Sequence, residues 1–259
     1  MRVYNRYAGT AWLYDADPRP IVTADLPFYQ ERARRMGGNV LELACGTGRI
    51  ALALAEQGSR VWGLDLSPEM LAVLEQKAET YPEAVQTRLH VTCGDMTDFA
   101  LAQAFRLILI PFRSLQLLES DAQVLQCLAC ARRHLEQHGR LIVHVFKPRG
   151  PMGAAWAEKK EKFDFEAEIA GGQKVTRYSI KRASDSERRL LWTDFIYRVT
   201  EADGNVNELR EGVRMRWYEE EDLRGLLEKA GFMVHEAYGW FDRRPSSEGP
   251  ELIFVCGLR

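Results

Sequence analysis

The sequence has no long apolar run, little cysteine and no excess of one charge, and each absence excludes a class of protein. No stretch of about 18 apolar residues occurs in the 259 residues, so no transmembrane helix is expected. The first residues lack the apolar segment of a secretory signal, and the five cysteines are scattered and odd in number. Both observations favour free thiols in a reducing cytoplasm.

The charge balance argues against a polyanionic partner. The formal net charge is −2 and the pI is near 6.3, so no global field attracts nucleic acid or an anionic membrane.

Cys127 and Cys130 form a CxxC pair, but they fall inside a helical pattern with no second cysteine pair nearby. We therefore expect them to pack in a helix and predict no metal site. The composition fits a cytoplasmic globular protein, monomeric or homodimeric.

Strand and helix patterns alternate along residues 25–148. This alternation predicts a mainly parallel sheet with helices on both faces. The expected helices span 25–36, 50–57, 67–78 and 121–137, and the expected strands span 40–43, 61–64, 89–93, 107–110 and 141–146.

The pattern changes after Pro148. Residues 149–174 are predicted to be irregular, with the charged run 158–162 as a solvated helix face, and residues 175–217 alternate as antiparallel strands do. A helix over 219–230 and strands over 233–238 and 252–256 follow. We expect residues 1–148 and 218–259 to form the core, with a helical N-terminal cap, and 149–217 to form a β-rich insertion over the active site.

The most informative stretch is residues 40–51, where an apolar strand runs into an acid, a two-glycine turn and a helix. Gly46 and Gly48 permit a sharp turn and close approach to a ligand, although a GxG alone is weak evidence. Glu42, Asp65 and Asp95 stand at the ends of three successive strands. At this edge of an open sheet, Asp65 can accept the ribose hydroxyls of a nucleoside and Asp95 can hold an adenine amino group.

The charge of Glu42 separates two cofactor classes. A dinucleotide places its pyrophosphate over the glycine turn, where repulsion from a carboxylate at about 6 Å costs roughly 3 kcal/mol. S-adenosylmethionine instead brings a sulfonium and an ammonium, which the same carboxylate attracts. The residues therefore favour S-adenosylmethionine, with S-adenosylhomocysteine as product. Helix capping by Asp65 or Asp95, and an ordinary strand-end acid at Glu42, are the alternatives.

Three motifs, residues 41–49, 63–71 and 93–96, together resemble the class I S-adenosylmethionine-dependent methyltransferases of the small-molecule N- and O-directed type. A weaker likeness resumes at 217–223 and 227–232. The resemblance implies an α/β, Rossmann-like, doubly wound sheet of seven strands whose last strand is antiparallel, plus an antiparallel β insertion. The cofactor-binding candidates are Tyr14, Glu42, Ala44, Gly46, Gly48, Asp65, Leu66, Met70, Asp95, Met96 and Pro111.

The acceptor side is less defined. The segment after the fourth strand lacks the Asn/Asp-Pro-Pro-Tyr signature of enzymes that methylate nucleobases or glutamine amides. Its Arg113 is a candidate for binding a substrate anion, or is held by a structural acid, and Phe112 either walls the pocket or packs in the core. From the N-terminal cap, Tyr7 is placed near the pocket. We assign no catalytic base, and His144, in a buried strand, is expected to be a satisfied core residue.

The sequence thus predicts a methyltransferase that acts on an N or O atom of a small molecule. Three alternatives remain: a protein or RNA methyltransferase with a local basic rim, a non-catalytic S-adenosylmethionine-binding protein, and a nicotinamide-dependent oxidoreductase.

Overall fold

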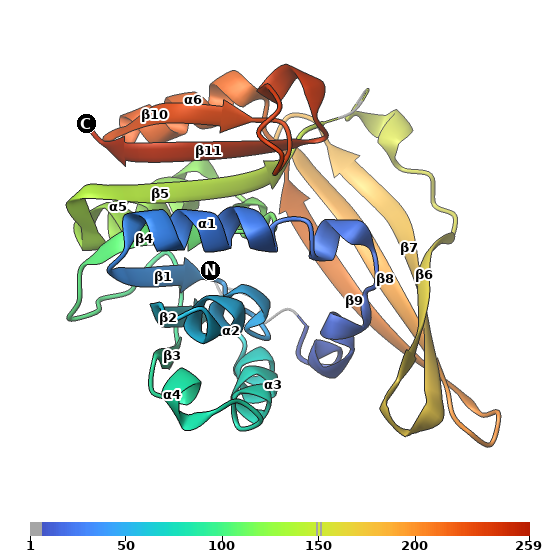
Figure 1. The fold of residues 1–259 in the computed structure, drawn as a ribbon. Helices are drawn as coiled ribbons and strands as arrows, with labels where there is room; N and C mark the ends of the chain where they lie inside the picture. The colour runs from blue at the N-terminus through green and yellow to red at the C-terminus, as the bar shows by residue number, and fades with distance from the viewer. Residues whose placement is uncertain (1–6, 149, 151) are drawn as a thin grey trace.

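The computed structural model describes residues 7–148, 150 and 152–259, and a seven-stranded mixed sheet forms its centre (Figure 1). The strands lie in the order β10-β11-β5-β4-β1-β2-β3. Their bounds are β1 Asn39–Leu43, β2 Arg60–Asp65, β3 Leu89–Cys93, β4 Phe105–Ile110, β5 Leu135–Phe146, β10 Phe232–Tyr238 and β11 Glu251–Leu258. All neighbours pair in parallel except β11, which is antiparallel to both β5 and β10, so the predicted fold class is confirmed.

Helices cover both faces of this sheet because its central strands are apolar on both sides. The helices α1 (Leu26–Met36), α2 (Arg49–Glu56) and α4 (Glu83–Gln86) pack on one face, and α5 (Asp121–His134) and α6 (Glu220–Lys229) pack on the other. The helix α3 (Pro68–Ala78) packs against Cys45 of the first strand–helix turn. In the described part of the chain, no helix combines the length and apolar character needed to cross a bilayer.

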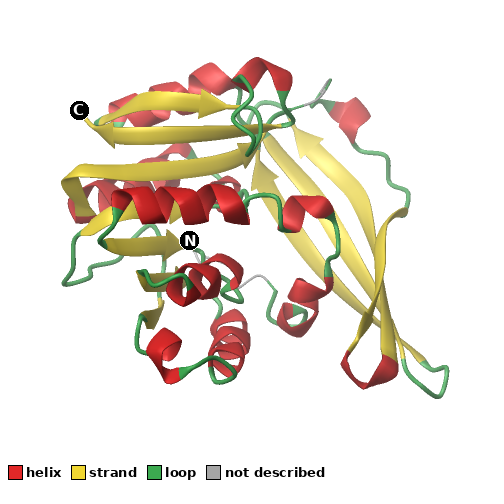
Figure 2. Cartoon of the chain, in the orientation of Figure 1, coloured by secondary structure: helices red, strands yellow, loops and turns green. Residues whose placement is uncertain are grey.

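A second sheet of four antiparallel strands stands beyond the carboxyl ends of the core strands (Figures 1 and 2). It consists of β6 (Lys162–Ile169), β7 (Gln173–Asp185), β8 (Leu190–Thr200) and β9 (Val206–Arg216) in that order. Residues 191, 193, 195, 197 and 199 share one face of β8, as the alternation predicted, and Tyr197 and Val199 are buried there. Leu13 of the N-terminal segment packs into the same cluster.

Four local expectations were wrong. Residues 149–174 are not wholly irregular, because a glycine turn at 171–172 with positive φ lets β6 pair with β7. The charged run 158–162 forms no helix; Glu158 pairs instead with Lys181 of β7.

The other two concern the limits of β5 and α5. The fifth strand begins at Leu135 instead of 141, and α5 ends at His134 instead of 137, because Leu135 already pairs with Phe105, with a register shift before the next pair, Leu107 and Arg140. The described part of the N-terminal cap contains the short 3-10 helices η1 (Ala11–Ala16) and η2 (Pro20–Val22). The remaining short turns are η3 (Ser114–Leu117), η4 (Ala154–Trp156), η5 (Ala170–Gly172) and η6 (Ser246–Glu248).

Candidate functional site

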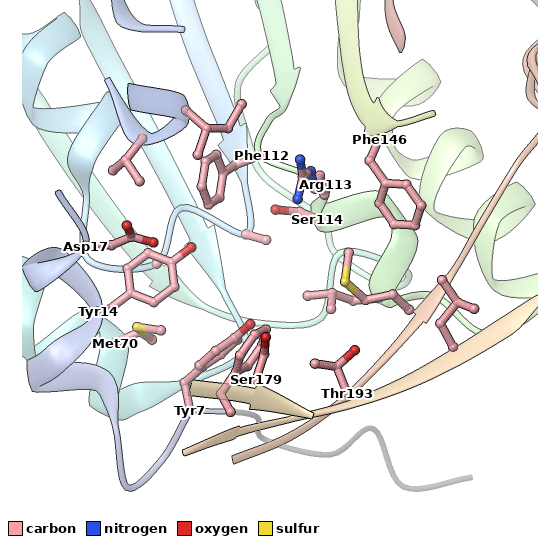
Figure 3. Close-up of a pocket in the computed structure, with 18 of the residues that line it drawn as sticks. Tyr7, Tyr14, Asp17, Met70, Phe112, Arg113, Ser114, Phe146, Ser179 and Thr193 are labelled. Atoms are coloured by element: carbon pink, nitrogen blue, oxygen red, sulfur yellow. The ribbon is translucent and has the colours of Figure 1, made fainter. Parts of the chain in front are cut away.

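A cavity of about 670 Å³ lies between the carboxyl ends of the core strands and the inner face of the four-stranded sheet. Its wall combines the turns after β1 to β4 with the N-terminal cap and the strands β7 and β8. Figure 3 shows Tyr14 and Met70 on one side, Arg113 and Phe146 on another, and Thr193 of β8 below them. The cavity sits where an open α/β sheet binds its ligand.

The turn after β1 is shaped by left-handed backbone. Ala44, Gly46 and Gly48 have φ of 57°, 55° and 78°, and Ala44 adopts this region despite its side chain. A Cβ on Gly48 would lie 2.6 Å from Cγ of Leu74, so only glycine fits there. Ala44 and Gly46 line the cavity, whereas Gly48 lies outside its wall, against α3.

Asp65, the last residue of β2, lines the cavity and braces the turn. One of its oxygens accepts a hydrogen bond from the Gly46 amide at 2.7 Å, and the other accepts from the Ser67 amide at 2.9 Å. Burial raises the pKa of Asp65, and the two backbone donors oppose that rise. Each oxygen keeps a lone pair for a further donor.

Asp95, after β3, offers a second acceptor. Its Oδ1 receives the Thr97 amide at 2.8 Å and the Thr97 hydroxyl at 2.7 Å. Leu66, Met70 and Met96 add apolar surface to the same part of the wall. Two acids separated by apolar side chains suit a nucleoside, which has polar edges and apolar faces.

Glu42 lies outside the cavity wall, buried at the end of β1 with 2 % of its surface exposed. Its Oε2 has no hydrogen-bond partner among the described residues. The nearby cation Arg49 is already paired with both oxygens of buried Asp25, at 2.5 and 2.7 Å. Burial raises the pKa of Glu42 to about 8. A cation beside this carboxyl would favour its ionised form.

The N-terminal cap lines the cavity beside the turn that follows β1. Tyr7 and Tyr14 both line the cavity, with ring centroids 5.5 Å apart in an edge-to-face arrangement. Burial raises the pKa of Tyr14, so its hydroxyl stays protonated. Asp15 accepts hydrogen bonds from Thr47 Oγ1 and Lys77 Nζ, both at 2.7 Å, which tie the cap to the turn.

The segment after β4 forms the opposite wall. Phe112 and Arg113 line the cavity, whereas Pro111 lies outside the wall. Arg113 pairs with Glu251 at 2.5 Å, so it is held by a structural acid while its exposed edge faces the cavity. His144 is fully buried and hydrogen-bonded through both ring nitrogens, as a satisfied core residue would be.

Sequence reasoning missed a charged cluster beneath the cavity. Arg177 of β7 is 8 % exposed and lines the cavity between Asp17, at 3.5 Å, and Asp164, at 3.1 Å. Its guanidinium lies 4.7 Å from the ring centroid of Phe165 and 4.8 Å from that of Phe195. The alternation of β7 could have shown that Arg177 faces inward, but its partner Asp17 comes from the distant N-terminal cap and Asp164 lies on β6, a strand that was not predicted.

Other candidates fall elsewhere. Cys127 and Cys130 are buried on α5, and the described residues contain no cluster of three metal-ligating side chains. The proposed basic rim is neutralised, since each arginine pairs with a carboxylate. These pairs are Arg214–Glu119, Arg216–Asp121, Arg243–Glu31 and Arg244–Asp242.

Comparisons with known proteins identify a matching family and relatives of the chain. Residues 40–139 match the family model described as a methyltransferase domain. The chain is 28% identical over 238 residues to the dTDP-3-amino-3,6-dideoxy-alpha-D-glucopyranose N,N-dimethyltransferase of Streptomyces fradiae, covering 87% of this chain and 84% of the relative.

Solved structures share the fold. The CcbJ methyltransferase from Streptomyces caelestis has a TM-score of 0.75 at 22% identity, covering 98% of this chain and 96% of that one. An S-adenosylmethionine-dependent methyltransferase from Clostridium acetobutylicum ATCC 824 has a TM-score of 0.76 at 20% identity, covering 97% and 98%. Residues 40–139, which match the family model, include the turn after β1 and the cavity-lining acids Asp65 and Asp95.

Proposed function

We propose that the chain is a class I S-adenosylmethionine-dependent methyltransferase that methylates an amino nitrogen of a small-molecule acceptor. The cofactor supplies a methyl group on a positively charged sulfur, and in-line transfer to nitrogen breaks the S–CH₃ bond as the N–CH₃ bond forms. The protein must therefore bind the donor, align the acceptor and exclude water.

The described wall fits the donor. Asp65 keeps lone pairs for the ribose hydroxyls, and Asp95 keeps Oδ2 for the adenine amino group. Leu66, Met70 and Met96 provide apolar surface for the adenosine. The Ala44–Gly46 backbone borders the amino-acid end of the donor in this arrangement.

Two groups suit the positive charges of the donor. The buried Oε2 of Glu42 has no donor among the described residues, so an ammonium brought to that end of the turn would satisfy it. The ring of Tyr14 borders the cavity and can stabilise a sulfonium through a cation–π contact. Gly48 and Pro111 lie outside the cavity wall, so they would shape the turns that hold the donor without contacting it.

The observation that favours nitrogen is the state of the cavity's carboxylates. Asp17 is hydrogen-bonded to Arg19 at 2.8 Å, Asp164 to Arg177 at 3.1 Å, and Glu251 to Arg113 at 2.5 Å. No carboxylate that lines the described cavity is without a donor, so none is poised as a general base. An amine needs no such base, because its ammonium form gives its proton to water before the attack, whereas a hydroxyl must lose its proton during the reaction.

The acceptor class follows from the cavity and from one relative. About 670 Å³ accommodates a nucleoside-sized donor together with a compact polar acceptor. The Streptomyces fradiae relative is named for an amino sugar attached to dTDP. We propose an amino sugar as the acceptor to test first. We further propose that the enzyme is cytoplasmic, acts as a monomer or homodimer, and has no nucleic-acid partner.

A matched pair of acceptors tests the choice of atom. The protein is incubated with S-adenosylmethionine and either dTDP-3-amino-3,6-dideoxyglucose or its 3-hydroxy analogue, and products are identified by mass spectrometry and NMR. We expect N-methylation of the amino sugar and no reaction of the hydroxy analogue. A broader panel of amino sugars and matched hydroxy sugars follows the same design. Transfer to oxygen in any matched pair, or no transfer to any amine, contradicts the proposal.

A further inference from the structure

The segment after β4 has left-handed backbone at the cavity wall. Phe112 and Arg113 have φ of 48° and 70°, so two consecutive residues with large side chains adopt the left-handed region. Such residues persist only where their surroundings hold them, and they gather at functional sites. Both side chains line the cavity beside Ser114, as Figure 3 shows.

One residue of β5 takes both amide hydrogens of this segment. The Phe112 amide donates to Nδ1 of His144 at 3.1 Å, and the Arg113 amide donates to the His144 carbonyl at 3.1 Å. Because Nδ1 accepts a hydrogen bond, the proton of a neutral ring is on Nε2. That nitrogen then donates to Glu251 Oε2 at 3.0 Å.

Glu251, which accepts from His144, also binds the side chain of Arg113 in the same segment. Its Oε1 accepts from Arg113 Nη2 at 2.5 Å, and its Oε2 accepts from Arg113 Nε at 3.2 Å. Glu251 is 2 % exposed and His144 is fully buried on the neighbouring antiparallel strand. Burial alone would raise the pKa of Glu251, but the His144 hydrogen bond and the Arg113 charge hold it below its usual range. The carboxylate is therefore ionised and fully engaged.

We infer that His144 and Glu251 are positioning residues for methyl transfer, which act by holding Phe112 and Arg113 in the left-handed conformation. Neither residue takes a proton from the acceptor. Without them the segment relaxes, the acceptor wall shifts, and the alignment that in-line transfer needs is lost. The consequence for catalysis rests on the proposed function, whereas the consequence for the segment does not.

Two substitutions of His144 separate its two ring nitrogens. In His144→Asn the amide oxygen lies near the position of Nδ1 and can still accept from Phe112. In His144→Gln the amide reaches the position of Nε2 and can contact Glu251, but the acceptor for Phe112 is gone. His134 of α5 is a matched control, since it is buried and its Nε2 accepts from the Leu101 amide at 2.9 Å.

The first measurement needs no acceptor. Amide hydrogen exchange of the peptide covering 110–118 is followed by mass spectrometry with S-adenosylhomocysteine bound. We expect exchange at least ten times faster in His144→Gln, and within threefold of wild type in His144→Asn. His134→Gln should leave this peptide unchanged. Unchanged exchange in His144→Gln, or equal acceleration in the Asn and Gln variants, overturns the inference.

The second measurement is turnover of an amine that the wild type methylates. We expect kcat to fall at least tenfold in His144→Gln with KM within threefold, and His144→Asn to recover most of the loss. Glu251→Gln, which keeps the side-chain size, provides a further variant if one at His144 does not fold, and it should lower kcat about tenfold. Wild-type kcat in Glu251→Gln refutes the inference. If the wild type methylates no amine, the proposed function is refuted. The hydrogen-exchange result would still decide whether His144 and Glu251 hold the segment.

Discussion

Replacing Glu42 with glutamine should change how stability depends on pH. The carboxyl is 2 % exposed, its Oε2 has no partner among the described residues, and burial raises its pKa from 4.5 to about 8. The charge of Arg49 opposes this rise only in part, and its guanidinium already pairs with buried Asp25 at 2.5 Å. In the cofactor-free protein at neutral pH, Glu42 therefore carries a proton that it would release in the unfolded chain.

The sign and size follow from proton linkage. Between pH 4.5 and about 8 the folded protein binds one proton more at this site than the unfolded chain, so its stability falls as pH rises. The slope is about 1.4 kcal/mol per pH unit, which amounts to about 5 kcal/mol across the whole window. Glutamine cannot ionise, so Glu42→Gln loses this slope and gains stability relative to wild type as pH increases.

Urea unfolding of both cofactor-free proteins at pH 5, 6, 7 and 8 measures the difference. The difference in unfolding free energy, variant minus wild type, should grow by about 3–4 kcal/mol from pH 5 to pH 8. Any constant cost of burying the amide is the same at each pH and cancels. Parallel curves for the two proteins would refute the assigned protonation of Glu42.

Three further predictions test the cofactor turn and the cap. Asp65→Ala removes the acceptor for the ribose and the Gly46 amide, and calorimetry should show at least tenfold weaker S-adenosylmethionine binding, about 1.4 kcal/mol or more; unchanged affinity would contradict its role. Gly48→Ala should lower Tm and the free energy of unfolding, the latter by about 1–3 kcal/mol, because residue 48 has a φ of 78° and its new Cβ would lie 2.6 Å from Leu74. Gly46→Ala should lose less stability, because no atom lies within 4 Å of its new Cβ. A larger loss in Gly46→Ala than in Gly48→Ala would be inconsistent with the geometry. Asp15→Ala should speed S-adenosylhomocysteine release several-fold in stopped-flow experiments, because it removes the Asp15–Lys77 ion pair that holds the cap. It should change stability by less than about 1 kcal/mol, since this ion pair is partly exposed. An unchanged release rate would mean that the cap does not retain the cofactor.

The core of the fold was predictable from the sequence because each element carries a local signal. Ser67 caps α3 by accepting a hydrogen bond from the Met70 amide, which agrees with the helix expected over 67–78, and the apolar strands take their expected places in the sheet. The strand β6 was missed although its residues alternate charged and apolar side chains, as a strand with one buried face does. It pairs with β7 over residues 162–169.

The candidate site shows the same division. Asp65 and Asp95 could be found because parallel strands end at a common edge of the sheet, and both line the cavity. The Asp17–Arg177–Asp164 cluster could not, since it joins three separate segments through side chains. Nor could the sequence show that Arg113 is tied to Glu251, 138 residues away along the chain. Contacts of this kind depend on tertiary packing, which no local pattern encodes.

The central claim is that the cavity at the strand ends binds S-adenosylmethionine and not a dinucleotide. Calorimetric titration of the purified protein with S-adenosylmethionine, S-adenosylhomocysteine and NAD, in separate experiments at the same pH, tests it most directly. We predict that the first two bind and that NAD produces no binding heat. Tight binding of NAD with no response to S-adenosylmethionine would contradict the claim.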